Sequence, residues 1–275
     1  MCHYKQAISG YQTEHVFHHF ATFHSVDEFL KLCRWAREKG VGVYILGNGS
    51  NTLFANRNVQ TLILKNALPR ELKHLGGDRY EVSSSVQINE VLLYCLQHSL
   101  QSFYYLAAVP ATVGGALAMN AGRGRQYNLS IYDFVESVTF LTHDTVTIMQ
   151  RTDMTLGYRS TPFTGVQRQL ILSATFHFSP VDLQGNPYNE RLEYCKKHYD
   201  CSGPNCGSVF KYANTHIMHL LRGVRIHKAR YSPTISNWIT NHAKDSRAIF
   251  RLIAIAKILH KITGQRIETE QIIVH

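Results

Sequence analysis

The sequence has little of what marks several special classes of protein. Six cysteines in 275 residues are too few for a disulfide scaffold and suit a reducing compartment. The longest apolar stretch, residues 248–262, is interrupted by Arg251, Lys257, His260 and Lys261, so no segment is expected to span a bilayer. The first twelve residues lack the basic start and apolar core of a secretory signal. We therefore expect a soluble, cytoplasmic protein.

Repeats, low-complexity tracts and long charge blocks are also absent, and the composition is that of a folded protein. Hydrophobic residues make up 44% and charged residues 17%, which argues against disorder. The length suits one large domain or two modest ones. The 29 Lys and Arg exceed the 19 Asp and Glu, for a net charge of +10. Such an excess attracts nucleotide phosphates, a nucleic acid backbone or acidic substrates, but it equally suits a hydrated surface.

Periodicity predicts a mixture of helices and strands. Ser25 and Glu28 form a capping-box pattern before apolar residues at helical spacing, and Gly40 ends this predicted helix. The other predicted helices cover residues 89–98, 189–198 and 244–263. The predicted strands cover residues 41–46, 61–64, 80–84, 135–142, 145–150, 170–178, 208–212 and 267–274. Helices and strands do not alternate strictly, so the expected fold class is α+β.

Two glycine-rich segments carry most of the functional information. The first follows a predicted strand and consists of Gly47, Asn48, Gly49, Ser50 and Asn51. Small residues there let consecutive backbone amides turn toward one point and bind an anion, although an ordinary turn has the same composition. The dinucleotide-binding fingerprint is incomplete, because its third glycine and following helix are missing.

The second segment, residues 110–122, is almost without large side chains. Its backbone can therefore approach something flat or phosphorylated, or it can pack tightly against another strand. Together the two segments favour a bound nucleotide cofactor. The residues that concern us in the second segment are Pro110, Ala111, Thr112, Val113, Gly114, Gly115, Asn120, Ala121 and Gly122.

Four polar residues farther along the chain could act on a substrate. Arg159, after Tyr158, offers a fork for a carboxylate or phosphate, but an isolated arginine is commonly a surface residue. Ser208 enters a predicted strand and could transfer a proton, although turn serines usually bond local backbone. Glu268 and Glu270 stand two apart, on one face of the last predicted strand. Either could act as an acid, or both could be solvated on an edge strand.

Metal binding is not expected. Cys195, Cys201 and Cys206 lie close together with His198, but their spacing fits none of the usual zinc or iron–sulfur patterns. The sixteen histidines are scattered, without a paired ligand helix.

These motifs, in this order, resemble the UDP-N-acetylenolpyruvoylglucosamine reductase family of flavoenzymes, in its shorter type. The family's Leu-Gly-Gly-Gly-Ser-Asn is similar to residues 46–51, and its Pro-Gly-Thr-Val-Gly-Gly-Ala…Met-Asn-Ala-Gly to residues 110–122. Its Gly-Tyr-Arg, Gly-Ser-x-Phe-Lys and Glu-x-Glu are found at residues 157–159, 207–211 and 268–270. The resemblance covers about residues 15–275, and the combined order is far more specific than any single motif.

The resemblance implies a p-cresol-methylhydroxylase-type FAD-binding domain of two α+β lobes, over residues 1–178, followed by a smaller α+β substrate-binding domain over residues 179–275. It implies that NADPH reduces FAD, and that FAD passes hydride to the enolpyruvyl group of UDP-N-acetylglucosamine enolpyruvate, giving UDP-N-acetylmuramate for peptidoglycan. The implied partner is a small-molecule UDP-sugar in a bacterial cytoplasm. The protein is expected to be a monomer without nucleic acid or membrane partners.

The family's residue roles also carry over by resemblance. Arg159 and Glu270 would stabilise the enol-like intermediate and Ser208 would supply its proton. The two glycine-rich segments would hold FAD, and Tyr158, Lys211 and Tyr212 would contact the substrate.

Departures from the family pattern concentrate in the second half. Tyr212 and Ala213 replace an asparagine and a proline, and His227 and Lys228 replace a glycine pair. Two other functions are therefore compatible with the sequence. One is a divergent flavin oxidoreductase with another substrate, and the other is a non-catalytic binding protein, with RNA as a conceivable ligand.

Overall fold

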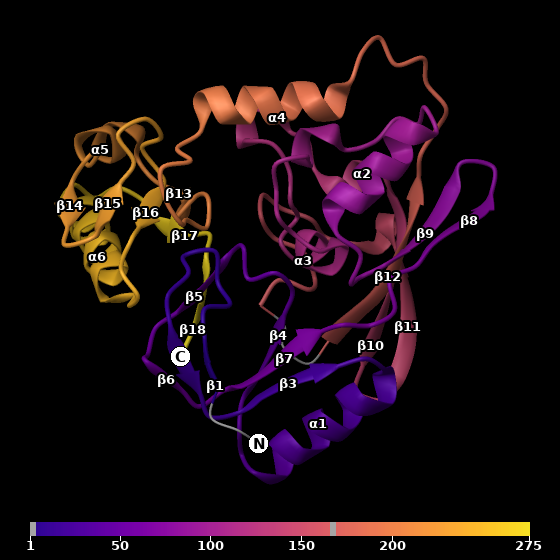
Figure 1. Cartoon of the computed structure of the whole chain (residues 1–275), viewed down its shortest axis with the longest axis horizontal. Helices are drawn as coiled ribbons and strands as arrows, with labels where there is room; N and C mark the ends of the chain where they lie inside the picture. The colour runs from indigo at the N-terminus through magenta and orange to yellow at the C-terminus, as the bar shows by residue number, and fades with distance from the viewer. Residues whose placement is uncertain (1–3, 166–168) are drawn as a thin grey trace. The chain divides into compact units, whose positions relative to one another are not determined.

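The computed structural model describes residues 4–165 and 169–275, and the chain forms two compact units (Figure 1). Unit 1 contains residues 1–20, 48–63 and 196–275, and unit 2 contains residues 21–47 and 64–195. Each unit is therefore assembled from separate stretches of the chain. The functional boundary expected at residue 178 stays a prediction; the compact units differ from it because the N-terminal segments pack with the C-terminal ones.

Unit 2 is built on a five-stranded antiparallel sheet in the order β11-β10-β12-β9-β8. Its strands are β8 (Leu72–Gly76), β9 (Arg79–Ser83), β10 (Val135–Thr142), β11 (Thr145–Gln150) and β12 (Gln169–His177). The predicted hairpin β10–β11 is confirmed, with Thr142 opposite Thr145. Side chains alternate along these strands, so one face of the sheet can be buried.

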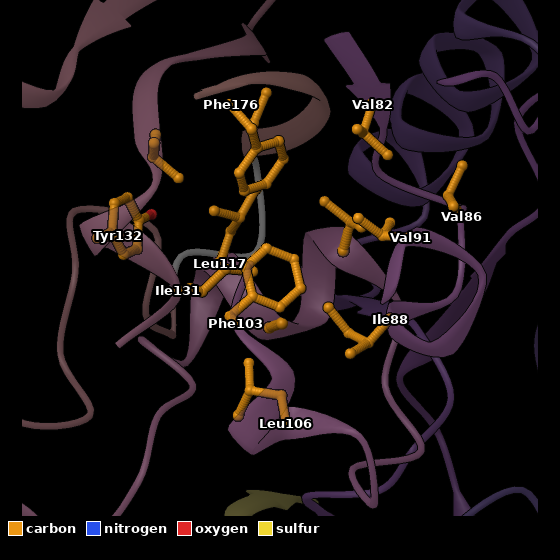
Figure 2. Packing of buried hydrophobic residues seen from close by; sticks show 14 of the residues in the cluster. Val82, Val86, Ile88, Val91, Phe103, Leu106, Leu117, Ile131, Tyr132 and Phe176 are labelled. Carbon is orange, nitrogen blue, oxygen red and sulfur yellow. The ribbon is translucent and has the colours of Figure 1, made fainter. Parts of the chain in front are cut away.

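Helices α2 (Ile88–Gln97) and α3 (Val113–Ala118) supply the apolar residues that cover this sheet. Figure 2 shows Leu117 of α3 between Phe176 of the sheet and Phe103, with Val91 of α2 beside them. All four side chains are fully buried. Fully burying side chains of this size stabilises the fold by about 1.5–3 kcal/mol each. This core fixes α3 and the second glycine-rich segment on the sheet.

Helix α1 (Val26–Glu38) lies in unit 2 and begins as its sequence predicts. The hydroxyl of Ser25 accepts a hydrogen bond from the amide of Glu28 at 3.2 Å. The carboxylate of Glu28 reaches back to the amide of His24, one residue before the position expected for a capping box. Gly40 follows the helix with a φ of +65°. A three-stranded sheet, β3-β7-β4, completes the unit; its strands are β3 (Phe20–Phe23), β4 (Val43–Leu46) and β7 (Leu62–Asn66).

The described residues of unit 1 form four small sheets and two helices that pack together. The sheets are β1-β2-β6, β13-β17, β14-β15-β16 and β18-β5. Their strands are β1 (Tyr4–Gln6), β2 (His15–Phe17), β5 (Thr52–Phe54), β6 (Asn58–Val59), β13 (Phe210–Tyr212), β14 (Arg225–Ile226), β15 (Ala229–Tyr231), β16 (Ile239–Asn241), β17 (Glu268–Thr269) and β18 (Ile272–Val274). Helices α5 (Thr215–Leu220) and α6 (Arg247–Ile262) pack together through a core that includes Ile217, Leu221 and Leu252.

The remaining elements are α4 (Pro187–His198), whose last residues enter unit 1, and four 3-10 turns. These turns are η1 (Tyr104–Leu106), η2 (Arg125–Tyr127), η3 (Ile131–Asp133) and η4 (Arg151–Asp153). Within residues 4–165 and 169–275, no helix combines the length and apolar composition that crossing a membrane requires. The mixture of helices and antiparallel sheets confirms the α+β class.

One element differs from its prediction in a way that affects the candidate site. The single strand expected over residues 267–274 is broken between β17 and β18. The amide of Glu270 donates to the carbonyl oxygen of Val209, and the next paired residue, Ile272, donates to Asn51. The chain changes partners at the break, so the strand alternation that the shared-face prediction relied on does not continue through Glu270.

Candidate active site

Thr112 organises the start of the second glycine-rich segment in unit 2. Its hydroxyl caps α3 by accepting a hydrogen bond from the amide of Gly115 at 3.2 Å. A Cβ atom at Gly47 would lie 2.8 Å from this hydroxyl oxygen, and one at Gly115 would lie 3.3 Å from it. Gly47, the first residue of the first segment, therefore lies against Thr112, and side chains larger than hydrogen would crowd this position.

Gly114 is required by the packing of the chain on itself. Its amide donates to the carbonyl oxygen of Ser84 at 2.9 Å, and a Cβ atom would lie 2.9 Å from the Cβ atom of Ser84. The alternative interpretation from sequence, tight packing against a strand, is therefore correct for this glycine. A similar approach occurs at Gly122, where a Cβ atom would lie 2.0 Å from the carbonyl oxygen of Leu129.

Arg159 clamps the end of the same segment. Its guanidinium donates to the carbonyl oxygens of Asn120 and Gly122, both at 2.9 Å. Asn120 returns a hydrogen bond from its side-chain amide to the carbonyl of Gly157 at 2.8 Å. Asn120 and Arg159 both have left-handed backbone, with φ values of +44° and +54°. Such conformations cost energy for residues other than glycine and persist where the surroundings hold them, often at functional sites.

Asn120 also offers a test of whether this site fits a flavin. Its side chain is 8% exposed, and within the described ranges no donor reaches its buried Oδ1 atom. A buried carbonyl oxygen without a donor costs about 1–3 kcal/mol, so such an atom indicates a ligand that donates a hydrogen bond. The imide N–H of a flavin ring is a donor of this kind. The cradle around Gly47 and Gly115, together with this oxygen, therefore fits FAD.

Two arginines contact the ring of Tyr158. The guanidinium of Arg125 lies 4.6 Å from the centre of its ring, and that of Arg159 lies 5.0 Å from it. Cations at these distances are attracted by the negative face of an aromatic ring. This contact fixes the ring beside Arg159.

The other half of the predicted site lies in unit 1. Gly49 has a φ of +67°, and a Cβ atom there would lie 2.1 Å from the carbonyl oxygen of Ile8. Its own carbonyl accepts a hydrogen bond from the amide of Gly10 at 3.0 Å. Asn48 precedes this glycine, and Ser50 joins it to Asn51.

Asn51 ties this first segment to the C-terminal glutamates. Its side-chain amide donates to the carbonyl oxygen of Glu270 at 3.2 Å, and its own carbonyl accepts from Ile272 at 3.0 Å. The carboxylate oxygen Oε2 of Glu270 is shielded from solvent. The interpretation of Glu270 as a solvated edge residue was therefore wrong.

Ser208 lies next to Glu270 through the backbone. The carbonyl oxygen of Val209 accepts from the Glu270 amide at 2.8 Å, while the Val209 amide donates to Asn237 at 2.9 Å. Ser208 itself forms an isolated bridge with Trp238. Unit 1 thus brings together Ser208, Glu270 and the end of the first glycine segment. Asn51 and Glu270 are 219 residues apart in the sequence.

Lys211 and Tyr212 lie on β13 opposite Glu268. The ammonium of Lys211 lies 2.6 Å from the Glu268 carboxylate, which Arg266 also contacts at 3.0 Å. Hydrogen bonds from these two cations hold the pKa of Glu268 below its usual value. The Arg266 guanidinium stacks 3.8 Å from the centre of the Tyr212 ring. Glu268 therefore orients Lys211. It differs from Glu270 in pairing with two cations on the surface, whereas Oε2 of Glu270 is shielded from solvent.

Three residues that support the site were missed by the sequence analysis. Lys65 donates to the carbonyl oxygen of Gly47, and burial lowers the pKa of its ammonium. Asn237 exchanges hydrogen bonds with the backbone of Phe210, at 3.1 and 2.7 Å. Trp238 pairs with Ser208. Nothing in the local sequence marks the first two, because their partners are distant along the chain.

Cys206 packs against the first glycine-rich segment, where its thiol donates to the carbonyl oxygen of Thr52 at 3.6 Å. Burial raises the pKa of the Cys206 thiol to about 12, so it stays protonated at neutral pH. Across the described ranges, no group of three or more His, Cys, Asp or Glu side chains is close enough to hold a metal ion.

Comparisons with known proteins define the class and then the family. Residues 17–149 match the family of FAD binding domains, so the chain is an FAD-binding protein. It is 31% identical to the UDP-N-acetylenolpyruvoylglucosamine reductase of Myxococcus xanthus, over 79% of this chain and 72% of that protein. It is 30% identical to the enzyme of the same name from Prochlorococcus marinus, over 88% of this chain and 86% of that protein. The chain belongs to the UDP-N-acetylenolpyruvoylglucosamine reductase family.

A solved structure agrees on the fold. The crystal structure of UDP-N-acetylenolpyruvylglucosamine reductase from Thermus caldophilus covers 98% of this chain and 96% of its own chain, with a TM-score of 0.78. The two sequences are 18% identical, so this match confirms the fold alone.

Proposed function

We propose that this protein is an NADPH-dependent flavoenzyme that reduces the enolpyruvyl group of UDP-N-acetylglucosamine enolpyruvate to UDP-N-acetylmuramate. The observation that carries this proposal is family membership combined with the motif positions, which keep Arg159, Ser208 and Glu270. Family membership does not favour a different substrate or a non-catalytic binding protein. The matched FAD-binding region lies inside residues 1–178, which supports that range as the FAD-binding domain and residues 179–275 as the substrate domain.

Two loops of the chain would hold the cofactor. The segments 47–51 and 110–122 would surround FAD, with the Oδ1 atom of Asn120 accepting a hydrogen bond from it. When bound there, FAD would supply the hydride chemistry between NADPH and the enolpyruvyl double bond. The clamp by Arg159 on residues 120–122 would keep this backbone in place during the reaction.

The polar residues would manage charge and protons on the substrate. Hydride addition to the double bond leaves negative charge on the neighbouring carbon and its carboxylate, which a guanidinium such as Arg159 stabilises. Ser208 would donate the proton that completes the reduction. Glu270, whose amide bonds to Val209 beside Ser208, would stabilise the enol-like intermediate. Tyr158, Lys211 and Tyr212 would contact the substrate, with Lys211 suited to its diphosphate.

The location and assembly are proposals of the same kind. We propose a monomer, and the relatives are bacterial proteins. We place the reaction in the bacterial cytoplasm, with the UDP-sugar as the small-molecule partner.

An anaerobic visible spectrum tests the proposed function. Purified protein with FAD should lose its flavin absorbance when NADPH is added and regain it when the enolpyruvyl UDP-sugar follows. Bleaching without recovery would reject this substrate, and failure to bind FAD at all would reject the flavoenzyme.

A substitution at Ser208 separates catalysis from binding. Ser208→Ala should slow the recovery step by about 10²–10⁴-fold and leave bleaching by NADPH unchanged. Ser236→Ala, a hydroxyl in the same unit outside the proposed site, is the matched control. Equal recovery rates in the two variants would remove Ser208 from the mechanism.

A further inference from the structure

The positive charge of the chain is concentrated in one segment of unit 1. Residues 213–266 contain ten Lys and Arg and a single acidic residue, Asp245, a net charge of +9. The remaining 221 residues contain 19 basic and 18 acidic residues. Nine of the ten basic side chains in the segment are exposed; they are Arg222, Arg225, Lys228, Lys244, Arg247, Arg251, Lys257, Lys261 and Arg266. Such an asymmetry indicates an anionic partner rather than general solubility.

The main helix of this segment, α6, is apolar on two faces. One face lies in the core of unit 1 through Ile249, Leu252 and Ala256. On the opposite side, Ile258 is 55% exposed and Ile262 is 76% exposed, one helical turn apart. Ile255, half-buried, precedes them at the i−3 position of Ile258. A stripe at this spacing is the pattern of a helix that covers its apolar face with another surface.

Basic residues flank this stripe. Arg251 lies on the same side of α6 at helical spacing, and Lys257 and Lys261 border the stripe one turn apart. Within residues 4–165 and 169–275, no carboxylate lies within ion-pair distance of these three residues. The neighbouring helix α5 adds Leu220, which is 80% exposed. The face therefore combines free cations with exposed aliphatic side chains.

We propose that the α6 face, defined as Arg251, Ile255, Lys257, Ile258, Lys261 and Ile262, docks on an anionic lipid bilayer. Lys and Arg near a membrane surface are attracted by acidic headgroups, and exposed aliphatic side chains enter the interface between headgroups and acyl chains. A helix with both features lies on a membrane without spanning it. Such binding would overturn our expectation from the sequence that the protein has no membrane partner.

The side chains of the stripe favour lipid over nucleic acid. Proteins that bind single-stranded nucleic acids place aromatic side chains where bases can stack, and those that bind duplexes rely on polar contacts. The α6 face presents isoleucine in place of aromatic rings. Its apolar residues have a natural partner in acyl chains and none in a phosphate backbone.

Sedimentation of the full-length, FAD-loaded protein with vesicles tests the proposal. The protein should sediment with vesicles of phosphatidylglycerol and phosphatidylcholine, stay in solution with phosphatidylcholine alone, and dissociate as ionic strength rises. No sedimentation with the anionic vesicles at low ionic strength would overturn the proposal. Equal sedimentation with both lipids would also overturn it, because charge would then play no part.

Two double variants test the two components of the face. Lys257→Gln with Lys261→Gln should weaken partitioning about fivefold for each removed charge. Ile258→Gln with Ile262→Gln should weaken it about tenfold or more. All four side chains project from the exposed side of α6, and flavin absorbance and turnover should match wild type.

Matched controls come from unit 2. Lys31→Gln with Arg34→Gln removes two exposed charges from α1, and Val146→Gln with Ile148→Gln removes two exposed aliphatic residues from β11. These variants should sediment like wild type. If a control loses as much partitioning as its α6 counterpart, the α6 face is not the docking surface.

Two measurements distinguish other occupants. If light scattering shows a dimer that Ile258→Gln with Ile262→Gln dissociates, the stripe is covered by a second copy and the membrane proposal fails. If single-stranded RNA binds and its binding depends on the lysines but not the isoleucines, while vesicles do not bind, the partner is nucleic acid and the proposal also fails.

Discussion

The two compact units differ completely in charge. Unit 2 contains 14 basic and 14 acidic residues and has no net charge, whereas unit 1 contains 15 basic and five acidic residues and carries the whole +10 of the chain. In unit 2 acids and bases balance, and some form surface ion pairs, such as Arg79 with Glu136 at 2.7 Å. In unit 1 five acidic residues cannot form ion pairs with all fifteen basic ones.

This difference indicates how the two units share the work. Unit 2 offers backbone, glycines and a buried amide oxygen, which recognise a cofactor by shape and hydrogen bonds. Unit 1 offers excess positive charge, which raises the local concentration of anionic ligands such as a UDP-sugar or an acidic lipid surface. Net charge thus describes the partners of unit 1, and says little about either fold.

The largest effect in this comparison is expected for Arg159, which tests whether unit 2 acts in substrate reduction, the step in which we place Ser208 of unit 1. Arg159→Lys in unit 2 keeps the charge but loses the planar fork that holds the carbonyls of Asn120 and Gly122. We expect recovery of flavin absorbance on adding the enolpyruvyl UDP-sugar to slow by about 10²-fold or more, with normal bleaching by NADPH. Arg125→Lys, which changes the other arginine near the Tyr158 ring, is the control. Slow bleaching in Arg159→Lys would show that the arginine serves the cofactor and not the substrate.

Local patterns in the sequence predicted the elements that are held by local forces. The amphipathic spacing of α1 and α6 and the hairpin β10–β11 follow from side-chain period and turn residues, and each was found within a few residues of its expected bounds. Helix α3 was missed because its small residues have no apolar period; the capping Thr112 was the available signal.

Long-range contacts set the rest of the site, and the sequence could not predict them. The break in the terminal strand depends on Glu270 pairing with Val209 and Ile272 pairing with Asn51. Neither hydrogen bond has a signal in the local sequence, so the alternating pattern predicted one continuous strand across the break. The glycines were identified as special, but whether a ligand or the chain itself required them could be decided only where a neighbour such as Ser84 was in place.

A glycine substitution tests whether the units depend on each other for stability. Gly49→Ala in unit 1 combines a φ of +67° with a Cβ atom 2.1 Å from the Ile8 carbonyl oxygen, and should cost about 3 kcal/mol. Gly40→Ala in unit 2 has a similar φ of +65° but open space around the Cβ atom, and should cost about 1 kcal/mol.

The two tryptophans report the units separately in urea denaturation. Trp35 lies in unit 2 and Trp238 in unit 1, so Trp35→Phe and Trp238→Phe backgrounds each follow one unit by fluorescence. Gly49→Ala should lower the midpoint reported by Trp238 more than that reported by Trp35. Equal shifts at both tryptophans would mean that the units unfold together.

A smaller effect, on the affinity for FAD, is expected from a substitution at Lys65 of unit 2. Lys65→Met removes the hydrogen bond that fixes the Gly47 carbonyl, which is worth about 1.4 kcal/mol for a charged donor. The FAD dissociation constant, measured by fluorescence quenching, should rise about tenfold. Lys73→Met changes an exposed lysine of the same unit, paired with Glu71, and should leave it unchanged. If both variants bind FAD like wild type, the Lys65 contact is dispensable.

The smallest expected effect is a pH dependence confined to unit 1. His15 is buried there, with its ring nitrogens 2.7 Å from the Asn56 carbonyl and 2.8 Å from the Thr13 hydroxyl, and burial lowers its pKa. Because the unfolded chain binds this proton more readily, unit 1 should lose stability as the pH falls below 6.5 toward the lowered folded pKa, and keep it above 6.5. The midpoint of thermal unfolding followed at Trp238 should therefore fall on acidification. His15→Gln should flatten this shift. A larger shift at Trp35 than at Trp238 would place the acid-sensitive group in unit 2 and would show that His15 is not the cause.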